Sequence, residues 1–454
     1  MVSRFRTFVA PAYLFACLLL GGSAQGIWQN MLLELAGLAI IAWAAVDGAD
    51  GPLAPAGRQL LFLAFAFVAV VILQLVPLPL GLWSDLGPRQ IVARGLELLG
   101  QRTAMEPLSL TPSASLNSIL GIIPPLALYC AMVRLKAYRT RLLAIALLAG
   151  AIAGVALGAL QVASSNPELS PWYLYEDTNL GKAVGFFANA DHMASLLLMT
   201  LPFIAAMVAA ARHSSVQNYS AAVALAVAAA MVVLVGLALN GSLAGYGLAL
   251  PVIAASALIV IPRRSPIRLW IVAVAGLLVI GSVVGLELTP IGSGRIGAHA
   301  TSAVQSRGQI LSTTLEAIED FLPFGSGLGS FQSVYPLYEK PEQVTPVYVV
   351  HAHNDYAEAA LELGAAGIVL ICLFLIWWAL AAWRVWRSAE ARPFARAASI
   401  ASAAVLVHSL ADFPLRTVAI AASFAMCLAL LADRRSAPAK TEKRELRPAR
   451  HRVI

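Results

Sequence analysis

A series of apolar runs, each roughly 17 to 25 residues long, constrains the fold more than any other feature. A helix of this length can span the hydrocarbon of a bilayer. Of the 454 residues, 59% are hydrophobic and 12% are charged, against roughly 25% charged in typical soluble domains. The sequence therefore predicts an all-α polytopic membrane protein that lies in a lipid bilayer, and we expect no nucleic-acid partner.

Breaks rich in Pro, Gly and charge divide the chain into about twelve candidate transmembrane helices. They are expected near residues 8–22, 30–46, 60–76, 116–133, 141–163, 184–211, 220–239, 243–262, 268–286, 364–383, 397–412 and 414–432. The first run could also be a signal peptide, but an uncleaved first helix is favoured because so many spans follow it.

The distribution of Lys and Arg orients these helices, because cytoplasmic loops carry the excess of positive charge. If the N-terminus starts in the cytoplasm and the sides alternate, the basic stretches 134–141, 263–268, 384–396 and 434–454 all fall inside. The sequence therefore predicts both termini in the cytoplasm.

Two hydrophilic stretches then face outward, at residues 77–115 and 287–363. The first contains a short amphipathic segment expected to lie at the membrane surface, most simply as a scaffold lid. The second is long and Gly-rich, and we expect it to be folded and functional. Residues 1–433 are predicted to form one transmembrane domain, and residues 434–454 a basic cytoplasmic tail.

The four cysteines each lie within an apolar run, so neither a disulfide nor a metal site is indicated. No cluster of His and Cys has the spacing of metal ligands, and no Asp-x-Asp run occurs in the acidic loop. We expect no metal and no cofactor.

Ionisable residues within spans are costly in hydrocarbon and tend to mark function or a specific partner. By the alternation of helices, Glu34, Asp191, His192, His408 and Asp412 all fall in the outer half of the membrane, with Arg416 at the start of the last helix. This pattern indicates a polar site open to the outer face. The alternative is simple pairing between helices, for example Asp412 with Arg416.

Five segments resemble, in order, those of the O-antigen ligase and polymerase superfamily. They are "GFFANADHMASLL" (185–197), the Ser-Arg of "VQSRGQIL" (304–311), "PFGSGLGSF" (323–331), "HAHNDYAEAALELGAAG" (351–367) and "HSLADFPLR" (408–416). The resemblance covers roughly residues 185 to 430. Many members have Asn in place of Asp191, and an Arg in place of Leu243.

The resemblance implies a glycosyltransferase of the bacterial inner membrane whose active site faces the periplasm. Such enzymes take a glycan from undecaprenyl diphosphate and join it to a lipid core, another glycan or a protein, without a metal. The expected substrate-binding residues are Asn189, Asp191, His192, Arg295, Lys340, Asn354, Glu358, Glu362, His408, Asp412 and Arg416.

The chemistry itself favours two residues as catalytic. Glycan transfer needs a base for the incoming hydroxyl and positive charge for the departing diphosphate. His353 suits the first role because an imidazole can be neutral near pH 7. Arg307 suits the second because its planar fork binds two phosphate oxygens, and Arg295 and Lys340 could assist it.

The segment "DYAE" (355–358) has the spacing of a helix capping box, with Asp355 as the cap and Glu358 reaching back. A helix is expected to start here and continue into the span from residue 364, with its positive N-terminal end beside His353.

The sequence thus predicts a ligase or polymerase of lipid-linked glycans. The alternatives are a transporter or flippase of the same glycans, or a non-catalytic partner in polysaccharide assembly. A transporter would need titratable groups or broken helices near the midplane of the membrane, and the scarcity of charge in the inner half argues against it.

Overall fold

The computed structural model describes residues 2–23, 28–47, 53–101, 104–212, 215–288, 295–344, 348–388 and 392–433. For residues 2–4, 282–288, 295–306 and 343 only the backbone is described. The predicted tail 434–454 lies outside the described residues.

Every apolar run predicted to be a span contains helix. These helices are α1 (Val2–Leu20), α2 (Trp28–Val46), α3 (Pro55–Gln74), α6 (Pro112–Leu120) with α7 (Ile123–Val133), α8 (Thr140–Ala163), α9 (Ala190–Ala211), α10 (Val216–Asn240), α11 (Leu243–Val260), α12 (Ile267–Leu288), α15 (Asp355–Arg387), α16 (Pro393–His408) and α17 (Val418–Ala432). In the described chain, eight segments are long and apolar enough to cross a membrane, and four shorter apolar helices accompany them. The all-α polytopic fold is confirmed, whereas the count of twelve spans and their orientation stay predictions.

Helix α9 lies at the centre of the bundle. It packs against α8, α10, α11 and α16, and its residues from Ala190 to Ile204 are all buried. Apolar residues of α9 lie on every face of the helix, which is the pattern of a helix that is enclosed by other helices. The predicted start at residue 184 was six residues too early, because Gly185 turns the chain with a positive φ and Asn189 caps the helix.

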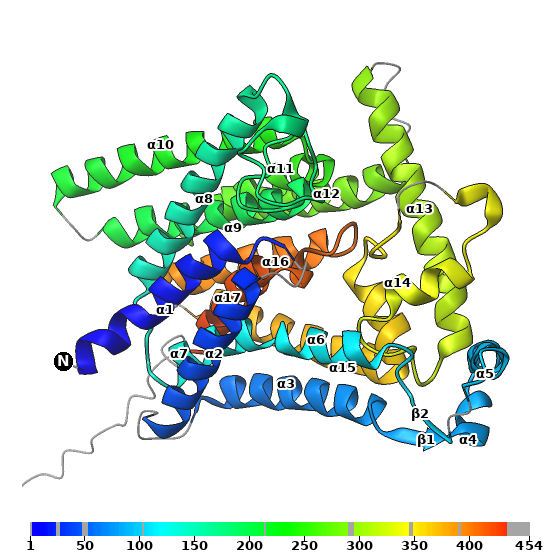
Figure 1. Ribbon diagram of the computed structural model, residues 1–454. Coiled ribbons are helices and arrows are strands. Elements are labelled where there is room, and N and C mark those ends of the chain that lie inside the picture. Colours follow the sequence, from blue (N-terminus) through cyan, green and yellow to red (C-terminus); the bar gives the residue numbers. More distant parts are fainter. Residues whose placement is uncertain are drawn as a thin grey trace, which may run out of the picture.

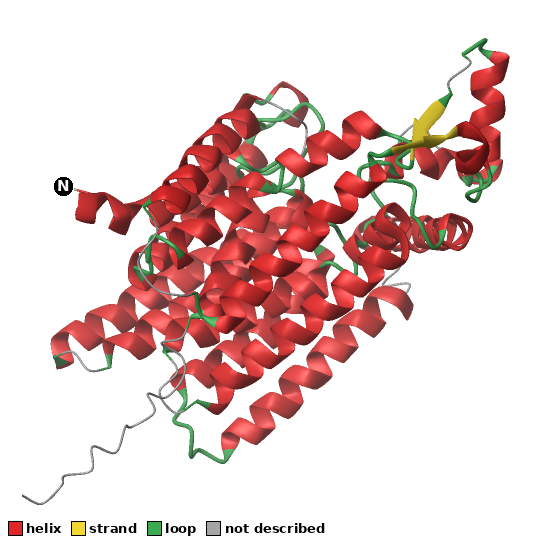
Figure 2. Ribbon diagram, turned by 90° about the horizontal axis from the view of Figure 1, so that it is seen from below, coloured by secondary structure: helices red, strands yellow, loops and turns green. Residues whose placement is uncertain are grey.

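A hairpin, three short helices and the long helix α13 gather at one end of the bundle. They are the hairpin of β1 (Pro77–Pro79) and β2 (Met105–Pro107), α4 (Leu80–Ser84), α5 (Arg89–Leu98), α13 (Arg295–Phe321) and α14 (Phe331–Val334). Figure 1 shows α13, α14 and the hairpin opposite the labelled N-terminus, and Figure 2 shows the hairpin at the same end from below. The segment predicted to lie at the membrane surface is α5.

Helix α13 was not predicted, although the loop that contains it was expected to be folded. Its Ile310, Ala317 and Phe321 are buried in a small apolar cluster with Ala357 and Leu361 of α15. These α13 positions recur at helical spacing, so the pattern was present in the sequence.

The Gly-rich turn after α13 interlocks with a break in α15. At Gly364 the backbone is not helical, with φ 62° and ψ −146°. The carbonyls of Leu361 and Glu362 instead accept from the amides of Ser326 and Gly327, both at 2.9 Å, and Ala365 N donates to Pro323 O at 2.9 Å. The helix predicted to continue through residue 364 is therefore broken there, and the turn satisfies the freed backbone groups.

The opposite end of the bundle carries arginines bound to backbone carbonyls. Arg263 donates to Trp386 O, and Arg268 donates to Leu258 O and Ile261 O. Both arginines belong to the basic stretch 263–268, and the placement of this stretch on the cytoplasmic side stays a prediction.

Candidate active site

The candidate site forms where helix ends from distant parts of the chain meet. Asn189 caps α9, Ser242 caps α11 and Asn354 caps α15, each through its side-chain oxygen. The C-terminal end of α16 reaches the same place at His408. Three helix N-termini therefore point toward one region, which favours negative charge there.

The predicted capping box at the start of α15 is wrong in detail. Asn354, not Asp355, is the cap, and its Oδ1 accepts from the amides of Tyr356 and Ala357 at 3.0 Å. Asp355 instead accepts from Ser409 Oγ at 2.7 Å, and Glu358 accepts from Ala352 N at 2.9 Å. The amide of Asn354 thus has a structural role, and it also donates to Leu410 O.

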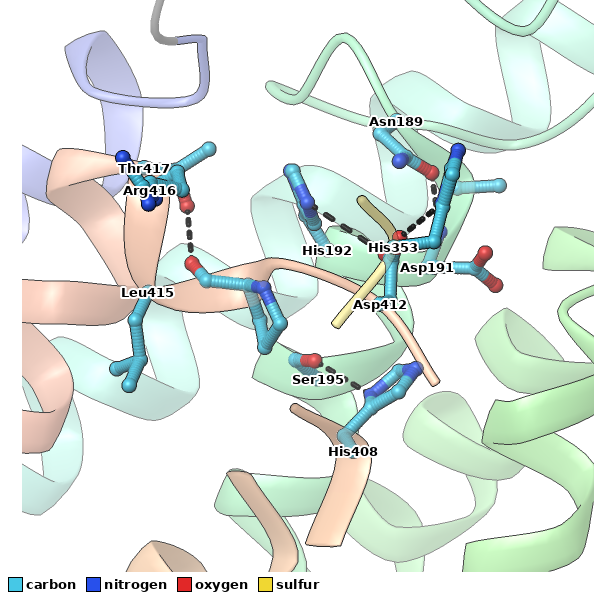
Figure 3. A network of polar contacts seen from close by, with 12 residues as sticks. Asn189, Asp191, His192, Ser195, His353, His408, Asp412, Leu415, Arg416 and Thr417 are labelled. Carbon is cyan, nitrogen blue, oxygen red and sulfur yellow. Dashed lines mark hydrogen bonds and ion pairs between the residues drawn. The ribbon is translucent and has the colours of Figure 1, made fainter. Parts of the chain in front are cut away.

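Asp412 lies between two imidazoles (Figure 3). Its Oδ1 is 2.9 Å from His353 Nδ1, and its Oδ2 is 3.6 Å from His192 Nε2. A carboxylate can only accept hydrogen bonds, so we assign the proton that the two side chains share to His353 Nδ1, with Asp412 Oδ1 as the acceptor.

This tautomer leaves His353 Nε2 as a hydrogen-bond acceptor. The His353 side chain is 26% exposed, whereas Asp412 is fully buried. The backbone of His353 also has a positive φ of 50°, a conformation that is uncommon for a residue other than glycine and is frequent at functional sites. An oriented imidazole with an accessible basic nitrogen is suited to take a proton from a hydroxyl group.

Arg307 projects from α13 toward the start of α9. Its Nη2 donates to Asp191 Oδ2 at 2.6 Å, and Ser242 Oγ donates to Asp191 Oδ1. Burial would lower the pKa of Arg307, but Asp191 and Asp412 raise it above its ordinary value, so the guanidinium stays charged. Leu243 begins α11 directly after Ser242 and provides no second cation.

His408 completes this first network from below (Figure 3). Its Nδ1 is 2.7 Å from Ser195 Oγ, one turn along α9 from Asp191. His408 Nε2, Asp412 Oδ2 and both ring nitrogens of His192 are buried and have no hydrogen-bond partner in the described structure. Such atoms are rare in protein interiors, so the network retains unused hydrogen-bonding capacity.

A second network lies beside the first and is built around Arg416. Its Nη2 is 2.9 Å from Glu362 Oε2 and 3.2 Å from Glu358 Oε1. Its Nε lies 3.9 Å from Asp355 Oδ1. The pairing of Asp412 with Arg416 that the sequence offered as an alternative is therefore wrong, since each residue contacts different partners.

The second network is saturated with internal contacts. Glu362 also accepts from Gly329 N at 2.9 Å, and Glu358 lies 2.8 Å from His351 Nδ1. Both carboxylates are at most 1% exposed. They hold the Gly-rich turn, α15 and the segment before α17 together, and their binding of a substrate stays a prediction.

Phe413 connects the two networks. Its ring centroid lies 4.1 Å from that of His351, 5.0 Å from that of His192 and 5.1 Å from that of His353. Sequence reasoning missed Phe413, Ser195 and Ser242, and it assigned no role to His351. Ser242 could have been found as a cap after Asn-Gly, and Ser195 from its helical spacing to Asp191 and His192.

Two predicted site residues fall elsewhere. Lys340 is 58% exposed and forms a surface pair with Glu316 at 3.6 Å, so the structure does not bring it into either network. The side chain of Arg295 lies outside the described residues. Among the described residues, no group of three or more His, Cys, Asp and Glu side chains is arranged to hold a metal ion.

Comparison with known proteins gives one family match. A family model described as O-antigen ligase matches residues 226–372, which include Ser242, Arg307 and His353. This match confirms the resemblance to the O-antigen ligase and polymerase superfamily. A search of curated proteins found no match to the chain.

Proposed function

We propose that this protein is an O-antigen ligase-like glycosyltransferase that transfers or polymerises a glycan from undecaprenyl diphosphate. The observation that best supports the proposal is that His353, held by Asp412, and Arg307, held by Asp191, join one network at one end of a membrane bundle, where Asp412 also acts on the charge of Arg307. The family match supports the same chemistry. We further propose that this end faces the periplasm of a bacterial inner membrane, where lipid-linked glycans meet their acceptors.

In the proposed reaction, an acceptor hydroxyl attacks the anomeric carbon that is bonded to the diphosphate. His353 Nε2 takes the hydroxyl proton while the new carbon–oxygen bond forms. The bond from the anomeric carbon to the diphosphate oxygen breaks, and the carrier leaves with the electron pair. Arg307 stabilises the negative charge that develops on the leaving diphosphate, and His353 later releases its proton to solvent.

Asp412 has a positioning role in this scheme. Its ionised carboxylate keeps the proton of His353 on Nδ1 and stabilises the imidazolium that forms during transfer. Because Arg307 supplies the positive charge, we propose that the reaction does not need a metal ion.

A reconstituted assay tests the proposal. Purified protein would be incubated with a defined undecaprenyl-diphosphate-linked oligosaccharide and with glycan, lipid-core or protein acceptors. A single shift of the acceptor on a gel identifies a ligase, and a ladder identifies a polymerase. Activity should persist in EDTA. The proposal is wrong if no acceptor is glycosylated, and its metal independence is wrong if EDTA stops transfer and magnesium or manganese restores it.

A further inference from the structure

The guanidinium that we assign to the donor diphosphate is already bound to an anion of the protein itself. Asp191 Oδ2 accepts from Arg307 Nη2 at 2.6 Å, and the two side chains are 12% and 27% exposed. The pair therefore lies at the border of the network, where a ligand can reach it. An incoming phosphate oxygen and the carboxylate would compete for the same donor group.

The charge balance makes this competition significant. Asp191 and Asp412 are the carboxylates that act on the charge of Arg307. The imidazole of His408 interacts with Asp191, and those of His192 and His353 interact with Asp412. When the imidazoles are neutral, two carboxylates face one guanidinium. A diphosphate would meet net negative charge unless Asp191 gives up its contact with Arg307.

Asp191 has other stabilising contacts that do not depend on Arg307. Its second oxygen accepts from Ser242 Oγ, and it lies in the first turn of α9, where the helix N-terminus favours negative charge. The buried His408 Nε2, which has no partner among the described residues, also belongs to this network. With Nδ1 accepting from Ser195, it can donate to an anion.

On the basis of the function proposed above, we propose that Asp191 sets the affinity of the site for the donor diphosphate, because the two anions compete for Arg307. In the empty site Asp191 neutralises Arg307, and on binding the diphosphate replaces it. The competition weakens donor binding, but it also speeds the release of the spent undecaprenyl diphosphate. Asp191 thus acts through Arg307 and takes no part in the bond changes.

The test is equilibrium binding of undecaprenyl diphosphate to the purified full-length protein. Asp191→Asn keeps an oxygen that can accept from Ser242 but removes the negative charge. An opposite charge at this distance is typically equivalent to one to three pKa units, so the variant should bind at least about tenfold tighter. In the Arg307→Ala background, Asp191→Asn should not tighten binding, because the guanidinium for which Asp191 and the diphosphate compete is absent.

Transfer kinetics provide a second measurement. Asp191→Asn should lower the KM for the donor and strengthen inhibition by undecaprenyl diphosphate by a similar factor. If Asp191 instead orients Arg307 for the donor, the same variant should bind more weakly and show a higher KM. Asp191→Ala should also bind more tightly than wild type, so it replaces Asp191→Asn if that variant does not fold.

The outcomes separate this inference from the proposed function. Tighter binding by Asp191→Asn in a protein that transfers no glycan supports the competition and overturns the transferase. Normal transfer with unchanged or weaker binding by the variant overturns the competition alone. If neither wild type nor variant binds the carrier diphosphate, both proposals are wrong.

Discussion

His353 lies where side chains from distant parts of the chain meet. Asp412 accepts from its Nδ1, and Phe413 contacts its ring. Its backbone adopts the left-handed region at φ 50°, so surrounding contacts hold it in a conformation that a free chain populates rarely. These constraints fix the orientation of an imidazole that remains 26% exposed.

At this scale we predict that His353→Ala lowers turnover by about 10²- to 10⁴-fold, the usual contribution of a general base. The KM for the donor should change little, because the imidazole is assigned to the acceptor proton. Asp412→Asn should also lower turnover, since an amide does not hold the proton on Nδ1 in the same way. Steady-state kinetics on purified variants measure both effects, and near wild-type turnover of His353→Ala would remove it from the mechanism.

Arg307 is predicted to depend on its shape as well as its charge. Arg307→Lys keeps the positive charge but loses the planar fork, so transfer should remain at least about tenfold impaired. Arg307→Ala should also weaken donor binding. Arg94, which is exposed on α5, gives the matched control, because Arg94→Ala removes one positive charge at the same end of the molecule and should retain activity. Full activity of Arg307→Lys would contradict the proposed clamp.

Helices of this protein are broken or capped where the candidate site needs irregular backbone. Helix α15 is interrupted at Gly364, and the turn that contains Gly325 and Gly327 binds the freed carbonyls. Arg89 fastens the outer hairpin to this turn, since its guanidinium donates to Leu108 O and Gly325 O at 2.7 Å. Burial lowers the pKa of Arg89 to about 10, so it still carries its charge near pH 7.

We predict that Gly364→Ala destabilises the protein strongly. A Cβ atom at this position would lie 2.3 Å from Pro323 O, and the backbone angles there are nearly exclusive to glycine. The free energy of unfolding should fall by at least about 2 kcal/mol, because this backbone conformation alone costs a residue other than glycine about 1–3 kcal/mol. Thermal unfolding of the purified protein measures it.

Gly276→Ala on α12 is the control for this substitution. Its Cβ would meet no atom within 4 Å, and Ala is a better helix former than Gly. This variant should therefore unfold at the same temperature as wild type or higher. Equal stability of the Gly364 and Gly276 variants would show that the break in α15 tolerates a side chain.

The molecule as a whole separates its polar networks from its basic stretches. Helix α13, which carries Arg307, and the hairpin lie at one end, opposite the labelled N-terminus in Figure 1. Arginines of the loops 263–268 and 384–396 bind backbone carbonyls at the other end. The apolar flanks between them, such as Phe62 and Phe65 on α3, are exposed and suited to lipid.

This separation predicts the accessibility of single cysteines to a membrane-impermeant thiol reagent. In a variant without Cys17, Cys130, Cys372 and Cys427, Glu316→Cys on α13 should be labelled from the periplasm. Arg139→Cys and Arg264→Cys, both exposed, should react only after the membrane is permeabilised. Labelling of these two positions from outside would show that the orientation is the opposite of the predicted one.

The amino-acid sequence was sufficient for the fold class and for most candidate residues. Apolar runs long enough to cross a bilayer can be satisfied only by helices, because every backbone group in lipid needs an internal partner. Ionisable residues inside such runs stand out because burying them is costly. Asp191, His192, His408 and Asp412 were found in this way, and the structure brings them together with His353 and Arg307.

Tertiary structure decided the partners of these residues. The same Asp412 and Arg416 are four residues apart, yet the segment after His408 is not a continuous helix, so each side chain turns to a different network. The break at Gly364 and the contact of Arg307 with Asp191, 116 residues away, also depend on how distant segments pack. Local sequence patterns show the periodicity of a helix and the free-energy cost of burying an ionisable residue. The choice of partner depends instead on contacts between residues that are far apart in the chain.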